Sequence, residues 1–185
     1  MFGVKLSISF YFIALLMLLL IIDRRGVFLM SLLAVFLHEL AHLSAMLFLR
    51  IDCISLQMVL GAVKIKCNDI IDVRKKAFIA LFGPFANFLL AFFLLSEKNM
   101  ISLFGASNFV LGIFNFLPIS GLDGGDILEF ALMKCKYKRT IYFAFSLIFI
   151  VLIFRIGVEV FLRYGGNPSL LIVGVYLIIL NLSKI

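Results

Sequence analysis

Charged residues are scarce in this chain, and long polar stretches are missing from it. Asp, Glu, Lys and Arg make up 15% of the 185 residues, whereas 64% are hydrophobic and the mean hydropathy is +1.21. A soluble domain is nearer half apolar. No polar stretch is long enough to form a separate water-soluble domain. This composition argues against a soluble protein and predicts one integral membrane domain over residues 1–185.

Three further absences narrow the function. The three cysteines, Cys53, Cys67 and Cys135, show no CxxC spacing, so we expect ordinary reduced thiols rather than a redox or metal site. The net charge is +7, but the basic residues form short clusters between apolar runs and no continuous basic face, which argues against nucleic-acid binding. No inverted repeat is visible in the sequence, which argues against a secondary transporter.

Six apolar runs are long enough to cross a membrane as helices. They cover approximately residues 4–22, 27–49, 77–95, 101–118, 140–162 and 168–183. Between the second and third runs, residues 62–67 alternate apolar and basic side chains, which is the period of a β-strand. The predicted fold class is therefore an all-α polytopic membrane protein of about six transmembrane helices. A small membrane-associated β-hairpin is expected between the second and third spans.

The distribution of Lys and Arg predicts how the chain crosses the membrane. Six spans place both termini and the second and fourth loops on one side. That side carries twelve of the 17 Lys and Arg residues, the other side carries four, and Arg155 lies within a span. Because cytoplasmic loops carry the excess of basic residues, both termini are expected in the cytoplasm. We expect a multi-pass protein of the bacterial inner membrane.

The only two histidines of the chain, His38 and His42, lie in one apolar run, in the sequence His-Glu-Leu-Ala-His. Ionisable groups at bilayer depth are rare and usually functional. On a helix, positions i and i+4 share a face, so both imidazoles can bind one zinc ion while Glu39 acts as a base. The alternative is a polar cluster in which the histidines hydrogen-bond to neighbouring helices.

A catalytic zinc site takes three protein ligands and leaves one position open, so a third ligand is needed. No Glu occurs between Glu39 and Glu97. The acids considered for the role are Asp52, Asp69, Asp72, Asp123, Asp126 and Glu129. Asp123 is favoured, because Pro118 ends the preceding helix and two glycines after Asp123 allow the backbone to turn back into the protein.

Three motifs together resemble those of a known family. They are His-Glu-Leu-Ala-His at 38–42, Gly-Pro-Phe-Ala-Asn at 83–87, and Asn-x-x-Pro-x-x-x-Leu-Asp-Gly-Gly at 115–125. They are similar to the motifs of site-2-type intramembrane zinc metalloproteases. The closest likeness is to the group of the stage IV sporulation protease, which processes a sigma-factor precursor. The resemblance implies one zinc ion per chain, held by His38, His42 and Asp123, with Glu39 activating water.

Four residues are candidates for contact with the substrate, and the resemblance implies one of them. Asn115, which precedes the proline of the third motif, corresponds to an asparagine thought to contact the substrate. Asn87 either packs between helices or lines the site. Val63 and Ile65 lie on the predicted strand, which could bind an unwound substrate segment as an added strand.

The expected partners follow from this assignment. They are a membrane-protein or membrane-tethered substrate cleaved near the cytoplasmic leaflet, a membrane inhibitor or regulator, and the lipid bilayer itself. Neither a PDZ nor a CBS domain is expected, because no polar stretch could form one. The alternative functions are a metal-ion transporter and a catalytically inactive membrane scaffold.

Overall fold

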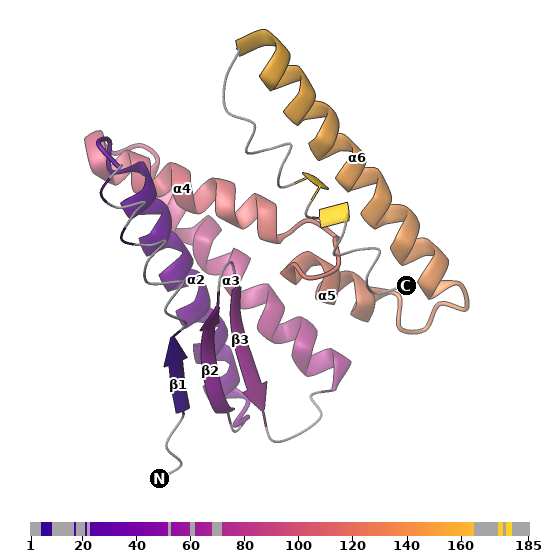
Figure 1. The fold of residues 1–185 in the computed structure, drawn as a ribbon. Helices are drawn as coiled ribbons and strands as arrows, with labels where there is room; N and C mark the ends of the chain where they lie inside the picture. The colour runs from indigo at the N-terminus through magenta and orange to yellow at the C-terminus, as the bar shows by residue number, and fades with distance from the viewer. Residues whose placement is uncertain are drawn as a thin grey trace. The chain divides into compact units, whose positions relative to one another are not determined.

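The chain folds into two compact units, Met1–Ile113 and Phe114–Ile185. The structure, a computed structural model, describes residues 5–8, 17, 21, 23–51, 53–59, 62–67, 72–164, 174–175 and 177–178. Helices dominate the described part of both units, and strands occur only in the described part of the first (Figure 1).

The first unit contains a mixed three-stranded sheet in the order β1-β2-β3. Its strands are β1 (Lys5–Ile8), β2 (Cys53–Val59) and β3 (Ala62–Cys67). β1 runs parallel to β2, and β3 pairs antiparallel with β2, so that Val63 lies opposite Met58 and Ile65 opposite Leu56 (Figure 1). β3 coincides with the strand predicted over residues 62–67.

β1 corrects two predictions. The sheet has three strands where a two-stranded hairpin was expected, and the third strand comes from residues assigned to the first transmembrane span. That span was predicted from about residue 4, so it is wrong at its beginning. The reason is that apolar content alone does not separate a strand from a helix. Lys5 to Ile8 alternates polar and apolar side chains, which suits a strand.

Three helices complete the first unit. They are α2 (Val27–Phe48), α3 (Val73–Leu94) and α4 (Asn99–Asn115). The last two residues of α4 belong to the second unit. α2 and α3 pack together around a small core of Ala45, Met46 and Ile79. The tight contact of Gly105 with the backbone of Leu94 and Leu95 brings α4 against the end of α3. α2 and α3 lie close to the predicted spans 27–49 and 77–95.

The second unit consists of α5 (Asp123–Ala131) and α6 (Lys138–Tyr164) around a core of Ile119, Ile150 and Leu177. α6 matches the predicted span 140–162. α5 lies in a segment that was predicted to be a loop, so the prediction was wrong there. Nine residues are too few to show the pattern of a span, and the glycine pair suggested a turn rather than the first turn of a helix.

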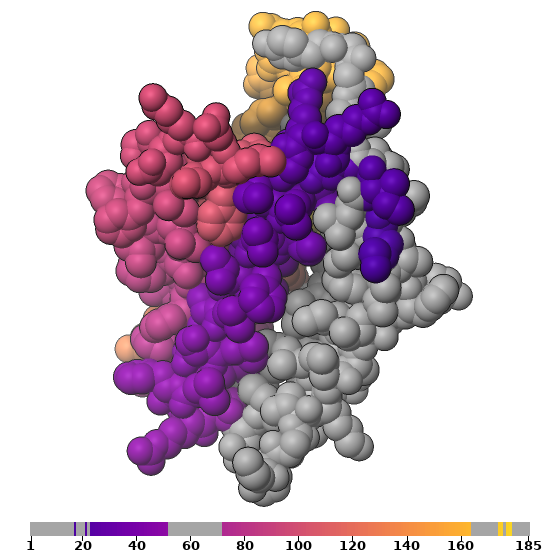
Figure 2. Space-filling view, turned by 90° about the vertical axis from the view of Figure 1, so that its left-hand side faces the viewer, coloured from indigo at the N-terminus to yellow at the C-terminus, as the bar shows by residue number. Residues whose placement is uncertain are grey.

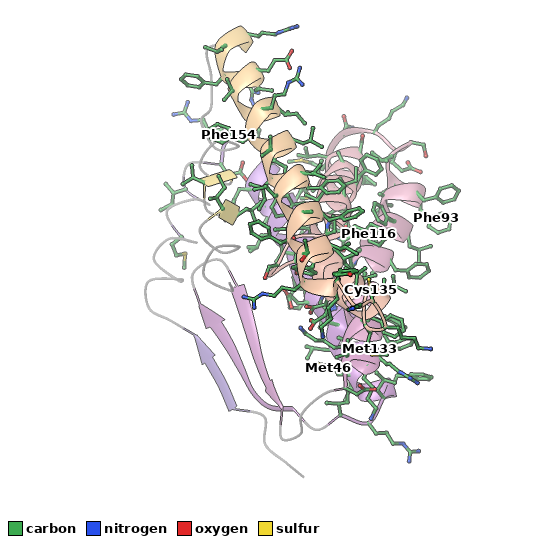
Figure 3. All side chains as sticks on the ribbon, turned by 90° about the vertical axis from the view of Figure 1, so that its right-hand side faces the viewer. Met46, Phe93, Phe116, Met133, Cys135 and Phe154 are labelled. Atoms are coloured by element: carbon green, nitrogen blue, oxygen red, sulfur yellow. The ribbon has the colours of Figure 1, made fainter. Side chains whose placement is uncertain are left out.

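Three of the described helices are long and apolar enough to cross a membrane: Val27–Phe48, Val73–Leu94 and Lys138–Arg163. Many large apolar side chains on them are exposed, as a lipid-facing surface requires. Leu33, Phe36 and Phe48 are exposed on α2. Figure 2 shows the residues of α2, in indigo and purple, at the surface of one face. Phe93 and Phe154, labelled in Figure 3, are exposed on α3 and α6. The count of six spans stays a prediction, because most of the first and sixth lie outside the described residues.

Candidate metal centre

α2 places both histidines on a buried face of the first unit. The side chains of His38 and His42 are only 4% and 8% exposed, whereas the opposite side of the same helix carries exposed apolar residues such as Phe36 and Leu40. Four residues separate the histidines, so they lie one turn apart on that face. The helix therefore holds two imidazoles inside protein in a segment that is otherwise apolar.

The two imidazoles point at a common position. Their Nε2 atoms lie 3.1 Å apart, and the rings meet edge to face with centroids 4.6 Å apart and planes at 89°. Two nitrogens bound to one tetrahedral zinc at about 2.0–2.1 Å lie about 3.3 Å from each other. The separation of the Nε2 atoms is therefore close to the one that a shared zinc ion needs.

A backbone carbonyl of α3 fixes how His42 presents its nitrogens. His42 Nδ1 lies 2.8 Å from the carbonyl oxygen of Ile79. A carbonyl oxygen only accepts, so Nδ1 carries the proton and donates it, and the Nε2 lone pair of the neutral ring faces His38. Metal-binding histidines usually use their second ring nitrogen in this way, which orients the ring and raises its basicity.

Gly83 on α3 keeps the space beside the histidine pair open. A Cβ atom at this position would lie 2.5 Å from His42 Nε2 and 2.6 Å from His38 Cε1. Cβ atoms essentially never approach other atoms so closely, so the glycine is required by the position of the rings. The converging nitrogens and this reserved space fit a zinc ion held by the two histidines.

Replacing Gly83 by Ala should therefore push the imidazoles apart. We expect the zinc affinity of the folded protein to fall about 10–100-fold, the usual effect of disturbing the surroundings of a ligand. The affinity is measured by competition with a chelator on the purified full chain. Gly105→Ala is the matched control, because its Cβ would meet the backbone nitrogen of Leu95 at 2.8 Å, away from the histidines. Equal zinc affinity in the two variants would show that Gly83 serves packing alone.

Glu39 follows His38 on α2 and is half-buried. Successive residues of an α-helix are turned by about 100°, so its carboxylate leaves the helix beside the histidine face and not on it. This placement suits a base that acts on a group bound by the histidines. Glu39 is not needed as a ligand in this arrangement.

Asp123 belongs to the second unit, where it is the first residue of α5 and is half-buried. Its position is set by the two glycines that follow. A Cβ on Gly124 would lie 2.2 Å from the carbonyl oxygen of Phe116, and one on Gly125 would lie 2.3 Å from that of Ile119. The first turn of α5 can thus lie against the segment that precedes it only because both residues lack side chains.

The arrangement of the elements has a known counterpart. The chain is similar to the solved structure of the site-2 protease from Methanocaldococcus jannaschii, with a TM-score of 0.64. The chain has the fold of a site-2 protease. The match covers 96% of this chain and 88% of that chain at 19% sequence identity, a level at which likeness establishes the fold alone. No protein-family model matches the sequence, and no curated protein is significantly similar to it.

The residues predicted to bind substrate have mixed placements. Asn87 is fully buried on α3, and neither polar atom of its amide has a hydrogen-bond partner in the described part of the chain. Asn115 is the last residue of α4 and is half-buried. Val63 and Ile65 lie on β3, at one side of the sheet. None of these placements tests a substrate contact, so the role stays a prediction for all four residues.

Sequence reasoning missed two contributors to the histidine pair. The carbonyl of Ile79 could not be found, since any apolar residue offers the same group. Gly83 is visible in the sequence only as part of the motif at 83–87. Its direct contact with both imidazoles depends on the pairing of α2 with α3, which the sequence does not specify.

Proposed function

We propose that this chain is an intramembrane zinc endopeptidase that cleaves a membrane-protein or membrane-tethered substrate near the cytoplasmic leaflet. One observation carries the proposal: the Nε2 atoms of buried His38 and His42 converge at 3.1 Å on an apolar helix, where Glu39 follows His38 in the sequence. The site-2 protease fold supports the same conclusion. A cluster that served only helix packing would not need a flanking carboxylate.

Asp123 is proposed as the third ligand. Support comes from the resemblance of the motifs and from the chemistry of the three side chains, two imidazoles and a carboxylate. Two imidazoles and one carboxylate make up a common ligand set of catalytic zinc. When bound, zinc makes water more acidic and polarises a carbonyl oxygen as a Lewis acid.

The protein's own groups then carry out the proton transfers. Glu39 takes the proton from the attacking water and delivers it to the nitrogen of the leaving amine. Ile79, through its carbonyl, holds His42 in the tautomer that keeps Nε2 available. Asn115 is proposed to donate a hydrogen bond from its amide to the substrate backbone.

The substrate must expose its scissile carbonyl, which a transmembrane helix keeps in its own hydrogen bonds. We propose that the substrate unwinds locally and adds to the sheet as a strand. β3 supports this idea because it pairs with β2 on one side only among the described strands. A photo-crosslinker placed at Val63 or Ile65 should trap the substrate. Equal trapping by a crosslinker on β1, at the other edge of the sheet, would contradict a specific role for β3.

The finer identity follows the resemblance of the motifs. We propose both termini in the cytoplasm of a bacterial cell, as the excess of basic residues on that side indicates. The substrate class would be a membrane-associated precursor of a transcription or sigma factor, as in the sporulation group. A membrane inhibitor or regulator would be the second partner.

The test is cleavage by the full chain in proteoliposomes that carry a membrane-tethered peptide. We expect a chelator to abolish cleavage and added zinc to restore it, since the proposed site needs the ion. A metal-ion transporter would instead move zinc into the liposomes without cleaving the peptide. An inactive scaffold would do neither, and cleavage that survives complete removal of the metal would sink the proposal.

A further inference from the structure

α6 holds the segment that precedes Asp123 through a buried hydrogen bond. The hydroxyl of Ser146 donates to the carbonyl oxygen of Pro118 at 2.9 Å, and the Ser146 side chain is fully buried. Serine is a costly residue to bury in an apolar helix unless its hydroxyl has a partner. The partner here is not the helix's own backbone but the irregular segment of residues 116–122.

Two other residues of α6 lie near this segment or near the first turn of α5 that follows it. Tyr142 and Ile150 lie one turn before and one turn after Ser146, so the three share one face of α6. The Tyr142 hydroxyl oxygen lies 2.8 Å from where a Cβ of Gly125 would be, and Ile150 packs with Ile119 in the core of the second unit. We call Tyr142, Ser146 and Ile150 the α6 row.

The segment of residues 116–122 needs support from another element because its own backbone hydrogen bonds join residues that are close in sequence. Leu122 donates its backbone N–H to the carbonyl of Ile119 at 3.1 Å, and Gly125 donates to Leu122 at 3.0 Å. Gly121 adopts a left-handed φ of 93°, which ends any regular structure there. In this part of the chain, the α6 row ties these local turns to a long helix.

We infer that the α6 row positions Asp123, and that Ser146 is the central positioning residue of the site. The first turn of α5 rests on the carbonyls of Phe116 and Ile119, so a shift of that segment moves Asp123 with it. The inference rests on the proposed role of Asp123 as a zinc ligand. It adds that the geometry of this ligand is set by a helix that carries no ligand itself.

The test compares three variants of the full chain in detergent or nanodiscs. Ser146→Ala removes the hydroxyl, Ser146→Thr keeps one, and Thr140→Ala removes an exposed hydroxyl from the same helix as a control. We expect Ser146→Ala to speed hydrogen exchange of the Leu122 and Gly125 amides and to weaken zinc binding about 10-fold or more. Thr at 146 should restore both properties, and Thr140→Ala should change neither.

If Ser146→Ala does not fold, Tyr142→Phe tests the other end of the α6 row by removing only a hydroxyl. Unchanged amide exchange and zinc affinity in the Ser146 or Tyr142 variants would overturn the inference. Weakened zinc binding in Asp123→Ala with unchanged binding in Ser146→Ala would do the same and leave the proposed function intact. A third outcome is faster amide exchange in Ser146→Ala together with unchanged zinc binding in both Ser146→Ala and Asp123→Ala. It would support the role of the α6 row in holding the segment and would remove Asp123 from the ligand set.

Discussion

Glu39→Gln should abolish peptide cleavage while leaving zinc binding unchanged. Glutamine keeps the shape of the side chain but cannot accept the proton of the attacking water. General acid–base catalysis contributes roughly 10²–10⁴-fold to a rate, and Glu39 is proposed to act in both proton transfers, so a loss toward the upper end is expected. The measurement is single-turnover cleavage of a membrane-tethered peptide, together with the zinc content of the same preparation.

Glu97→Gln is the matched control for Glu39, because Glu97 lies exposed in the turn between α3 and α4. It should cleave at the rate of the unmodified protein. Retained cleavage in Glu39→Gln would remove this residue from the mechanism. Loss of zinc together with loss of cleavage would make Glu39 a ligand or a structural residue, and a different base would then be needed.

The long helices could be predicted well from the sequence. α2 was expected over 27–49 and occupies Val27–Phe48, and α6 was expected over 140–162 and occupies Lys138–Tyr164. A continuous apolar run of about 20 residues has few other uses in a polytopic protein. Length and hydropathy decide such helices without any knowledge of their neighbours.

Two short elements, β1 and α5, were not predicted, for a physical reason. β1 adjoins a longer hydrophobic run and was assigned to it, and its strand conformation depends on pairing with β2, far along the chain. α5 carries two glycines in its first turn, and a glycine pair is more typical of a turn than of a helix. Contacts with the preceding segment override that preference, since any side chain at Gly124 or Gly125 would collide with backbone carbonyls.

The candidate site shows the same division. His38, Glu39 and His42 are recognisable because their chemistry is out of place in an apolar run and their spacing is local. The groups that hold them in place are not recognisable, because they are ordinary. A carbonyl at Ile79 and a glycine at 83 acquire their roles only from the packing of α3 against α2, which are distant in sequence.

Asp123→Ala should weaken zinc binding more than any change outside the ligands. Loss of an outer-shell partner lowers metal affinity roughly 10–100-fold, and loss of an anionic ligand should exceed that range, because two neutral imidazoles then hold the ion alone. Cleavage should disappear in parallel. The measurement is zinc affinity by chelator competition, with the folded state checked by thermal unfolding in the same detergent.

Asp126→Asn provides the decisive comparison for Asp123. Both acids lie in the first turn of α5 and are half-buried, so they share the same local environment and the same favourable end of the helix dipole. Asp126→Asn should keep its zinc, because the proposed ligand set does not include it. If Asp126→Asn loses zinc and Asp123→Ala retains it, the third ligand lies one turn further along α5. The proposed ligand set would then be His38, His42 and Asp126.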